Sequence, residues 1–481
     1  MKTSKQSFDG LLKEGRVVSH NPVTKDVLFD VEKSTSGDIE RVLKKAKSVL
    51  SKWSQLPVSE RMAYLSSFQK KLIENKSKLS ELIAKETGKP LWESLTEVSA
   101  MVNKIDITFK SFENRCPDLT IQTKDTLTTT RYKSLGIVVV LGPFNFPGHL
   151  PNGHIIPALL MGNVVVFKPS ELTPAVGNMM VDLWIEAGLP DGVLSICFGE
   201  SEEGRYLVEH PDVTGVFFTG SSTTGEKIQK SIIGHPYKLA ALEMGGNNSL
   251  IIESFENQSA AVLTAIQSAF MTAGQRCTCA RRLVLVRSKE TLSFVEQFVE
   301  ATRIMKIGAY NTDSFIGSVI SDLSYKNILN SVDDLVKRGS NSILNTQDME
   351  PPFVRPVILD STDVDRGDEE IFGPVTQIIW VSSVEEAMSV CNESTYGLST
   401  SILAKSKWSY DKVFNGIRSG LIHWNMPTNG ASSYAPFGGV GRSGNYRPSA
   451  YFAIDYCGYP VSTILRSTLE FPDSLPIGLT I

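Results

Sequence analysis

Short apolar runs alternate with amphipathic helical patterns along most of the chain. Between residues 136 and 245, Val- and Ile-rich runs such as Ile137–Leu141 and Val164–Phe167 recur, and helical patterns separate them. Continuous apolar runs separated by helices are typical of a parallel sheet that is covered on both faces. A second series of the same kind starts near 249, after Gly245-Gly246, which we interpret as a domain hinge. The pattern therefore predicts an α/β fold with two such units.

Four segments depart from this rhythm. Residues 1–36 are mostly irregular with one short extended piece, and residues 38–112 show only helical periodicity. The Thr-rich stretch Leu119–Lys133 favours extended strands, as in an arm or hairpin. The last residues, 456–481, are again extended and contain proline, so they could pair with this arm or with another subunit.

Composition narrows the class of protein. A chain of 481 residues is too long for one ordinary core, and 41% hydrophobic with 21% charged residues describes a globular protein. The net charge of -4 gives no electrostatic reason to expect nucleic acid or a membrane as partner. We see no secretory signal at the N-terminus and no apolar run long enough to span a membrane. Six cysteines in a chain of this length favour reduced thiols in the cytoplasm, and no Cys/His group has metal-ligand spacing.

The most informative stretch is Phe270–Ala280, which follows a helix expected at 258–273. It places Cys277 next to Arg276, in a Gly/Thr/Gln setting unlike a core strand. A neighbouring cation lowers the pKa of a thiol and makes it a better nucleophile, although a lone cysteine is more often inert packing. Cys279 is interpreted as structural, or as a thiol that could bond reversibly with Cys277.

Two strand ends offer groups for a dinucleotide. A buried strand leads into Gly220, and Ser221 can cap the helix that follows, so backbone N–H groups would face a phosphate. Lys168 and Glu171 follow another strand end, where they could hold ribose hydroxyls, and the carboxylate would repel the 2′-phosphate of NADP. An ordinary strand-to-helix turn and a solvated charged loop are the alternatives.

Two further polar residues stand at the ends of apolar strands. Asn145, between aromatic residues, could donate to a developing oxyanion or could form an Asx turn. Glu243 could act as a general base whose pKa is raised by burial, or could cap a helix. The formal G-x-G-x-x-G at Gly439–Gly444 is rejected as a dinucleotide loop, because no apolar strand precedes it and a poor helix start follows.

Taken together, these motifs resemble the NAD(P)-dependent aldehyde dehydrogenase superfamily over nearly the whole chain. The matching motifs are Pro-Phe-Asn145-Phe-Pro, Lys168-Pro-Ser-Glu171, Phe-Thr-Gly220-Ser221, Leu-Glu243-Met-Gly-Gly, Gly-Gln-Arg-Cys277, Glu370-Ile-Phe-Gly-Pro-Val and Pro-Phe437-Gly-Gly. The resemblance implies a Rossmann-like NAD-binding domain (1–112 and 135–245), an α/β catalytic domain (246–447) and an extended β oligomerisation arm (113–134 and 448–481). It also implies a homo-oligomer, as a homodimer or a dimer of dimers.

The resemblance assigns roles to residues. Cys277 would attack the aldehyde to give a thiohemiacetal and then a thioester, Asn145 would hold the oxyanion, and Glu243 would activate water. The cofactor would be NAD, contacted by Lys168, Glu171, Gly220, Ser221, Gly225, Glu370 and Phe372. Of these, Glu370 and Phe372 would position the nicotinamide ribose and ring.

Within the superfamily the chain looks most like the N-succinylglutamate 5-semialdehyde dehydrogenase branch, which works in arginine breakdown by the succinyltransferase route. The motifs that carry this are Gly142–His154, Lys168–Pro174, Gly274–Arg282 and Arg447–Tyr451. The implied substrate is an aldehyde that carries two carboxylates. We expect its anionic groups to be held by residues among His149, Arg276, Ser433 in the loop 428–433, and Arg442, which stands where a small residue is usual.

Two other functions stay open at this point. Glutamate semialdehyde and succinate semialdehyde are shorter anionic aldehydes that the same chemistry would oxidise. A catalytically silent, NAD-binding structural protein on the same fold is the alternative from a different class.

Overall fold

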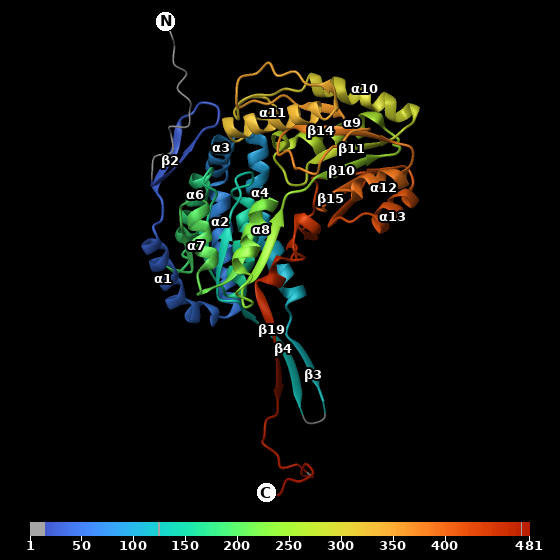
Figure 1. The fold of residues 1–481 in the computed structure, drawn as a ribbon. Coiled ribbons are helices and arrows are strands. Elements are labelled where there is room, and N and C mark those ends of the chain that lie inside the picture. Colours follow the sequence, from blue (N-terminus) through green and yellow to red (C-terminus); the bar gives the residue numbers. More distant parts are fainter. Residues whose placement is uncertain (1–14, 124–125, 473) are drawn as a thin grey trace.

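The computed structural model describes residues 15–123, 126–472 and 474–481. The expectations for the first 14 residues lie outside this range. Figure 1 shows two α/β bodies side by side and a narrow arm of strands that projects from the lower body. Among the described residues, no helix combines the length and the apolarity needed to cross a membrane. The boundaries of the three domains stay predictions.

The first body is built on a five-stranded, fully parallel sheet in the order β7-β6-β5-β8-β9. β5 lies in the middle, β6 and β7 follow on one side of it, and β8 and β9 then lie on its other side. The carboxyl ends of strands at such a switch point frame a crevice in which α/β proteins bind ligands. The strands are β5 (Ile137–Leu141), β6 (Val164–Lys168), β7 (Leu194–Ile196), β8 (Val213–Gly220) and β9 (Leu239–Met244).

Helices cover both faces of this sheet and close one hydrophobic core around it. In that core the rings of Phe68 and Trp184 stack with their centroids 3.7 Å apart. Ser221 caps the last helix of the unit through the Thr224 N–H. The helices are α1 (Ser36–Ser54), α2 (Val58–Glu74), α3 (Lys76–Thr87), α4 (Leu91–Arg115), α5 (His149–Met161), α6 (Pro174–Glu186), α7 (Ser201–Glu209) and α8 (Ser222–Ile232).

The N-terminal segment contains more strand than the sequence pattern predicted. β1 (Arg16–His20) and β2 (Val27–Glu32) form an antiparallel hairpin, whereas only the second strand was expected. β1 is short and half-buried, so its apolar alternation is too weak to stand out from the sequence.

The second body holds a seven-stranded sheet in the order β12-β13-β14-β11-β10-β15-β16, parallel except for β12 at one edge. Its strands are β10 (Asn248–Ile252), β11 (Ala280–Val286), β12 (Asn341–Leu344), β13 (Val357–Asp360), β14 (Val375–Val381), β15 (Ser399–Leu403) and β16 (Leu421–Trp424). Its helices are α9 (Gln258–Phe270), α10 (Lys289–Arg303), α11 (Asp322–Lys337), α12 (Val384–Asn392) and α13 (Lys407–Gly416). The predicted α/β fold is confirmed in both bodies.

The helix that leads into the reactive stretch ends earlier than predicted. α9 stops at Phe270, and a short 3₁₀ turn follows, η2 (Met271–Gly274), with φ of 58° at Thr272 and 52° at Ala273. These left-handed conformations are costly for residues other than glycine. A tertiary contact fixes this turn, because the Thr272 hydroxyl donates to the buried Glu93. The turn also packs closely at Gly274, where a Cβ would lie 1.9 Å from the Gly373 carbonyl oxygen.

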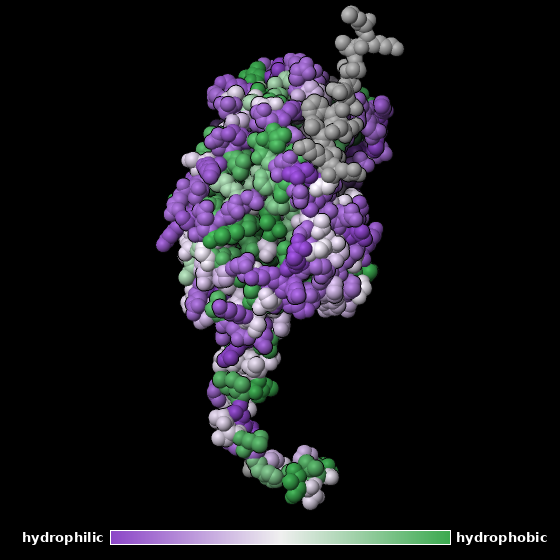
Figure 2. All heavy atoms as spheres, turned by 90° about the vertical axis from the view of Figure 1, so that its left-hand side faces the viewer, coloured by the Kyte–Doolittle hydropathy of each residue, from purple (hydrophilic) through white to green (hydrophobic). Residues whose placement is uncertain are grey.

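The arm is a three-stranded antiparallel sheet of β3 (Leu119–Gln122), β4 (Leu127–Ser134) and β19 (Gly458–Leu465). β4 lies in the middle, so the predicted pairing of the C-terminal segment with the arm is confirmed. Ile121 and Ile464 both pair with Thr128 and are mostly exposed, at 66% and 71%. Figure 2 shows apolar side chains along this projection and on the tail below it.

Candidate active site

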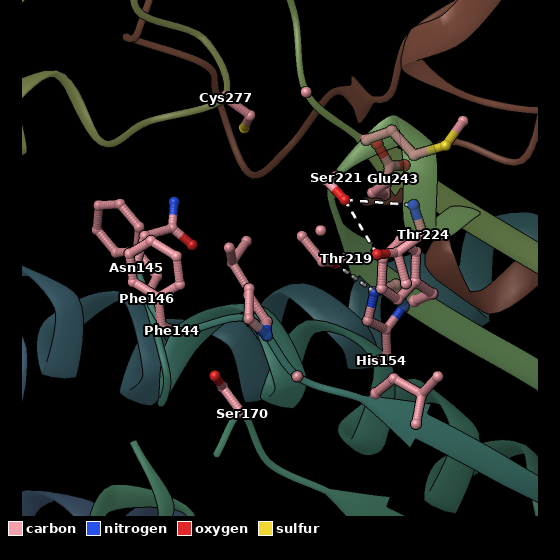
Figure 3. A pocket seen from close by; sticks show the side chains of 18 of the residues that line it. Phe144, Asn145, Phe146, His154, Ser170, Thr219, Ser221, Thr224, Glu243 and Cys277 are labelled. Atoms are coloured by element: carbon pink, nitrogen blue, oxygen red, sulfur yellow. Dashed lines mark hydrogen bonds between the residues drawn. The ribbon is translucent and has the colours of Figure 1, made fainter. Parts of the chain in front are cut away.

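One cavity of about 1070 Å³ lies where the carboxyl ends of the five-stranded sheet face the second body. It is lined by residues that follow β5, β6, β8 and β9, and by the loop that holds Cys277. Cys277, Asn145 and Glu243 all border it, together with the dinucleotide candidates Lys168, Glu171, Gly220, Ser221, Glu370 and Phe372. Figure 3 shows the Cys277 side chain pointing into this space from one side, with Asn145 and Glu243 on other sides.

Cys277 is half-buried, and hydrogen bonds from Asn248 at the start of β10 hold its loop. The side-chain amide of Asn248 donates to the backbone oxygens of Cys277 at 2.7 Å and of Cys279 at 2.9 Å. Burial, with a smaller contribution from the nearby carboxyls of Glu370 and Glu243, raises the pKa of the Cys277 thiol to about 12, and Arg281 opposes this rise. A thiol with this pKa is protonated at neutral pH.

The role predicted for Arg276 as a tuner of the Cys277 thiol stays a prediction, and the structure gives this cation a buried carboxylate partner. Its guanidinium lies 2.7 Å from the fully buried carboxylate of Glu93 and also donates to Thr272. It lies over the ring of Phe146, with 5.0 Å to the centroid. Arg276 also lines the cavity, and the cation that opposes the rise in the pKa of Cys277 is Arg281.

Asn145 is held by a buried network rather than by an Asx turn. Its Nδ2 donates to the Gln275 carbonyl oxygen at 2.9 Å, and its backbone oxygen accepts from Lys89 Nζ at 2.6 Å. Lys89 also pairs with Glu97 at 2.8 Å, and both side chains are almost completely buried. Glu97 in turn accepts the N–H groups of Gly148 and His149, so it holds the first turn of α5. An amide has two donor hydrogens, and one is left for a ligand.

Glu243 stands at the end of β9 and does not cap a helix. Its Oε1 accepts from the Ser449 N–H at 3.0 Å, while its Oε2 is buried without a hydrogen-bond partner. Burial raises the pKa of Glu243 well above its ordinary value, as predicted, and the bonds from Ser449 oppose the rise only in part. A carboxylate with a raised pKa is a stronger base toward water than an ordinary one.

The other half of the cavity suits a dinucleotide. Lys168 is buried at the end of β6, with Nζ 3.8 Å from the half-exposed carboxylate of Glu171, so both can face a ribose. Ser221 and the first turn of α8 border the cavity, and a helix N-terminus favours phosphate. Gly225 does not line it; a Cβ there would lie 2.2 Å from the Met244 sulfur, so this glycine permits close packing of α8 on β9.

Glu370 and Phe372 close the cavity from the second body. A Cβ at Gly245 would lie 1.7 Å from a Glu370 oxygen, so the glycine is needed for this carboxylate to approach the end of β9. Burial raises the pKa of Glu370, which Arg281 opposes from 3.6 Å. Phe372 meets Phe144 edge-on, with ring centroids 5.8 Å apart.

The candidates for anion binding separate into two groups. His149 and Ser433 line the cavity. Burial lowers the pKa of His149 to about 4, so it is neutral and does not serve as a cation. Arg442 does not line the cavity: it lies against α8, where it donates to Ser222 and pairs with Glu226 at 3.4 Å. The turn around it is η3 (Gly441–Ser443), which follows β17 (Pro436–Phe437), as expected for a G-x-G-x-x-G that binds no dinucleotide.

The sequence interpretation missed a row of charged residues on α4 and just before it. Lys89, Glu93, Glu97 and Lys104 are all buried around the cavity. The helical period was a usable signal, because Glu93 and Glu97 are four residues apart on the same side as the apolar Met101. Charged residues on the apolar face of a helix indicate a buried network.

The family comparison agrees with this geometry. The model of the aldehyde dehydrogenase family matches residues 12–458. The chain belongs to the aldehyde dehydrogenase family. The fold and the enzyme class read from the motifs are thereby confirmed.

Relatives of this aldehyde dehydrogenase include proteins of similar length. It is 43% identical over 466 residues to the N-succinylglutamate 5-semialdehyde dehydrogenase of Paraburkholderia xenovorans, with 96% of each chain covered. It resembles the glyceraldehyde-3-phosphate dehydrogenase GapN of Methanocaldococcus jannaschii, solved with NADP (26% identity, TM-score 0.89, covering 94% and 99% of the two chains). It also resembles an indole-3-acetaldehyde dehydrogenase solved with NAD⁺ (26% identity, TM-score 0.89, 94% and 93%).

Proposed function

We propose that this aldehyde dehydrogenase oxidises N-succinyl-L-glutamate 5-semialdehyde to N-succinyl-L-glutamate with NAD, in arginine breakdown. The observation that carries the proposal is the meeting of Cys277, Asn145 and Glu243 in one cavity, in a chain with full-length relatives of that name. The cavity is large enough for a long aldehyde next to a dinucleotide.

The reaction starts with attack of Cys277 on the aldehyde carbon. The thiol first gives its proton to water, and the thiolate sulfur then forms a C–S bond to the aldehyde carbon. The carbonyl π bond breaks, and its electrons make the oxygen an oxyanion held by the free N–H of the Asn145 amide. A nicotinamide dinucleotide, when bound, supplies the hydride acceptor and a positive ring charge that favours the thiolate. The thiol needs such help, because its burial raises its pKa to about 12.

Glu243 acts after the acyl group is on sulfur. Its carboxylate takes a proton from water, the hydroxide attacks the thioester carbon, and the C–S bond breaks to return Cys277 and release the acid. The Ser449 N–H at 3.0 Å holds one carboxylate oxygen, which leaves Oε2 for the water.

The residues at the dinucleotide end favour NAD. Lys168 and Glu171 lie together at the end of β6, and the Glu171 carboxylate repels a 2′-phosphate. The first turn of α8 presents N–H groups beside Gly220 and Ser221. Glu370 and Phe372 take the nicotinamide ribose and ring in this assignment.

The arm serves as an inter-subunit element in a dimer or a dimer of dimers. Its exposed row of Ile121, Thr128 and Ile464 needs a cover, because a monomer rarely exposes apolar strands that protrude from its body.

A substrate panel tests the proposal. Purified protein is given NAD and N-succinylglutamate semialdehyde, glutamate semialdehyde, succinate semialdehyde and hexanal, and NADH is followed by absorbance. The first aldehyde should have the highest kcat/KM. Cys277→Ala should bind NAD but form no NADH. Equal kcat/KM for hexanal would refute the substrate, and wild-type protein without any NADH burst would favour a silent NAD-binding protein.

A further inference from the structure

Lys104 is a cation in the cavity wall that no carboxylate neutralises. It stands on α4 with only 2% of its surface exposed, and it lines the cavity. Its Nζ donates to the backbone oxygen of Ala450 at 2.7 Å. Within the described residues, no carboxylate lies at ion-pair distance from it.

The neighbouring cations, unlike Lys104, form ion pairs with buried carboxylates. Lys89 pairs with Glu97 at 2.8 Å, and Arg276 pairs with Glu93 at 2.7 Å. Buried charges are normally paired in this way, since an unpaired one loses its hydration without compensation. The cost is visible at Lys104, because burial lowers the pKa of its ammonium to about 8.

The position of Lys104 places it at the reacting end rather than at the dinucleotide end. Ala450 belongs to the short strand β18 (Ser449–Ala450), whose Ser449 N–H binds the Glu243 carboxylate. His149 and His154, five residues apart on α5, also lie near Lys104, whose charge contributes to the lowering of the pKa of each imidazole. Gly153, between them on the cavity wall, has no atom within 4 Å of the place a Cβ would take, so this wall is open.

We propose that Lys104 binds a carboxylate of the aldehyde substrate and so selects anionic aldehydes. The inference rests on the proposed function and names the residue that recognises the anion. An ammonium has three N–H donors, and Ala450 takes one of them, so two are available for a carboxylate. A charge-assisted bond formed away from water is strong, and a neutral aldehyde cannot form it.

The test compares Lys104→Met with Lys110→Met, an exposed lysine on the same helix that does not line the cavity. Each variant receives N-succinylglutamate semialdehyde, succinate semialdehyde and hexanal. Lys104→Met should lower kcat/KM for the anionic aldehydes about 10- to 100-fold, mainly through KM, as expected for one hydrogen bond to a charged group. Its kcat/KM for hexanal should stay equal or rise, and Lys110→Met should behave like wild type.

The inhibition constant of N-succinylglutamate gives a readout without turnover, and it should rise by the same factor in Lys104→Met. Lys104→Gln keeps a donor for Ala450 and serves if the Met variant does not fold. An equal loss for charged and neutral aldehydes, or no loss at all, overturns the role of Lys104. If wild type instead prefers succinate semialdehyde while Lys104→Met still loses it selectively, the proposed substrate fails and the anion anchor stands.

Discussion

The buried pair of Lys89 and Glu97 offers the sharpest test of how the site is held. Lys89 Nζ lies 2.8 Å from Glu97, 2.6 Å from the Asn145 backbone oxygen and 3.9 Å from the centre of the Phe146 ring. Lys89→Met removes all three contacts and leaves the Glu97 charge buried, which costs about 3–5 kcal/mol of stability. The surface pair of Lys85 and Glu81 provides the control, because Lys85→Met should cost less than about 1 kcal/mol.

The same change should weaken catalysis through Asn145. If the Asn145 amide loses its position, the oxyanion loses one donor, worth about 3 kcal/mol or roughly 100-fold in kcat. Stopped-flow measurement of the NADH burst reports this step directly, and thermal unfolding reports stability. Lys89→Met in an Asn145→Ala background should then lower the burst rate no further. Additive losses in the double variant would refute action through Asn145, and a Lys89→Met protein with wild-type melting temperature would refute the energetic argument.

Three further predictions concern the base, the cofactor and the arm. Turnover should fall as the pH drops through the raised pKa of Glu243, at pH values where an ordinary carboxyl is still ionised, because only the ionised form accepts a proton. Glu243→Gln should keep a burst of NADH but lose steady turnover, and a missing burst in folded protein would contradict the role in deacylation. Glu171→Gln should improve kcat/KM for NADP about tenfold with little change for NAD, so an unchanged NADP/NAD ratio would reject repulsion as the basis of selection. Ile464→Asp should reduce the assembly size measured by light scattering, whereas Thr120→Asp on the other face of the arm should not, and equal sizes for all three proteins would exclude this face as an interface.

The local pattern of apolar and polar residues determines most of the architecture. Runs such as Ile137–Leu141 and Val164–Phe167 are short and wholly apolar, and only a strand buried on both faces suits them. The sequence placed Asn145, Lys168, Ser221 and Glu243 at strand ends. All four border one cavity, because the carboxyl ends of parallel strands share one edge of a sheet. The sequence also indicated the aldehyde dehydrogenase family, because the motifs typical of that family are spread over nearly the whole chain.

Only the tertiary structure decided which charges face one another. Arg276 stands next to Cys277 in the sequence, yet it pairs with Glu93 on α4, and Arg442 turns to Glu226 instead of the cavity. Lys104 and Lys89 come from the helical segment and its start, where sequence alone marked no site, and they lie in or beside the cavity wall. Short-range pattern specifies backbone conformation, because backbone hydrogen bonds and apolar periodicity are local. The partner of a buried charge depends on packing between elements that are far apart in the chain, so it emerges only when the fold is complete.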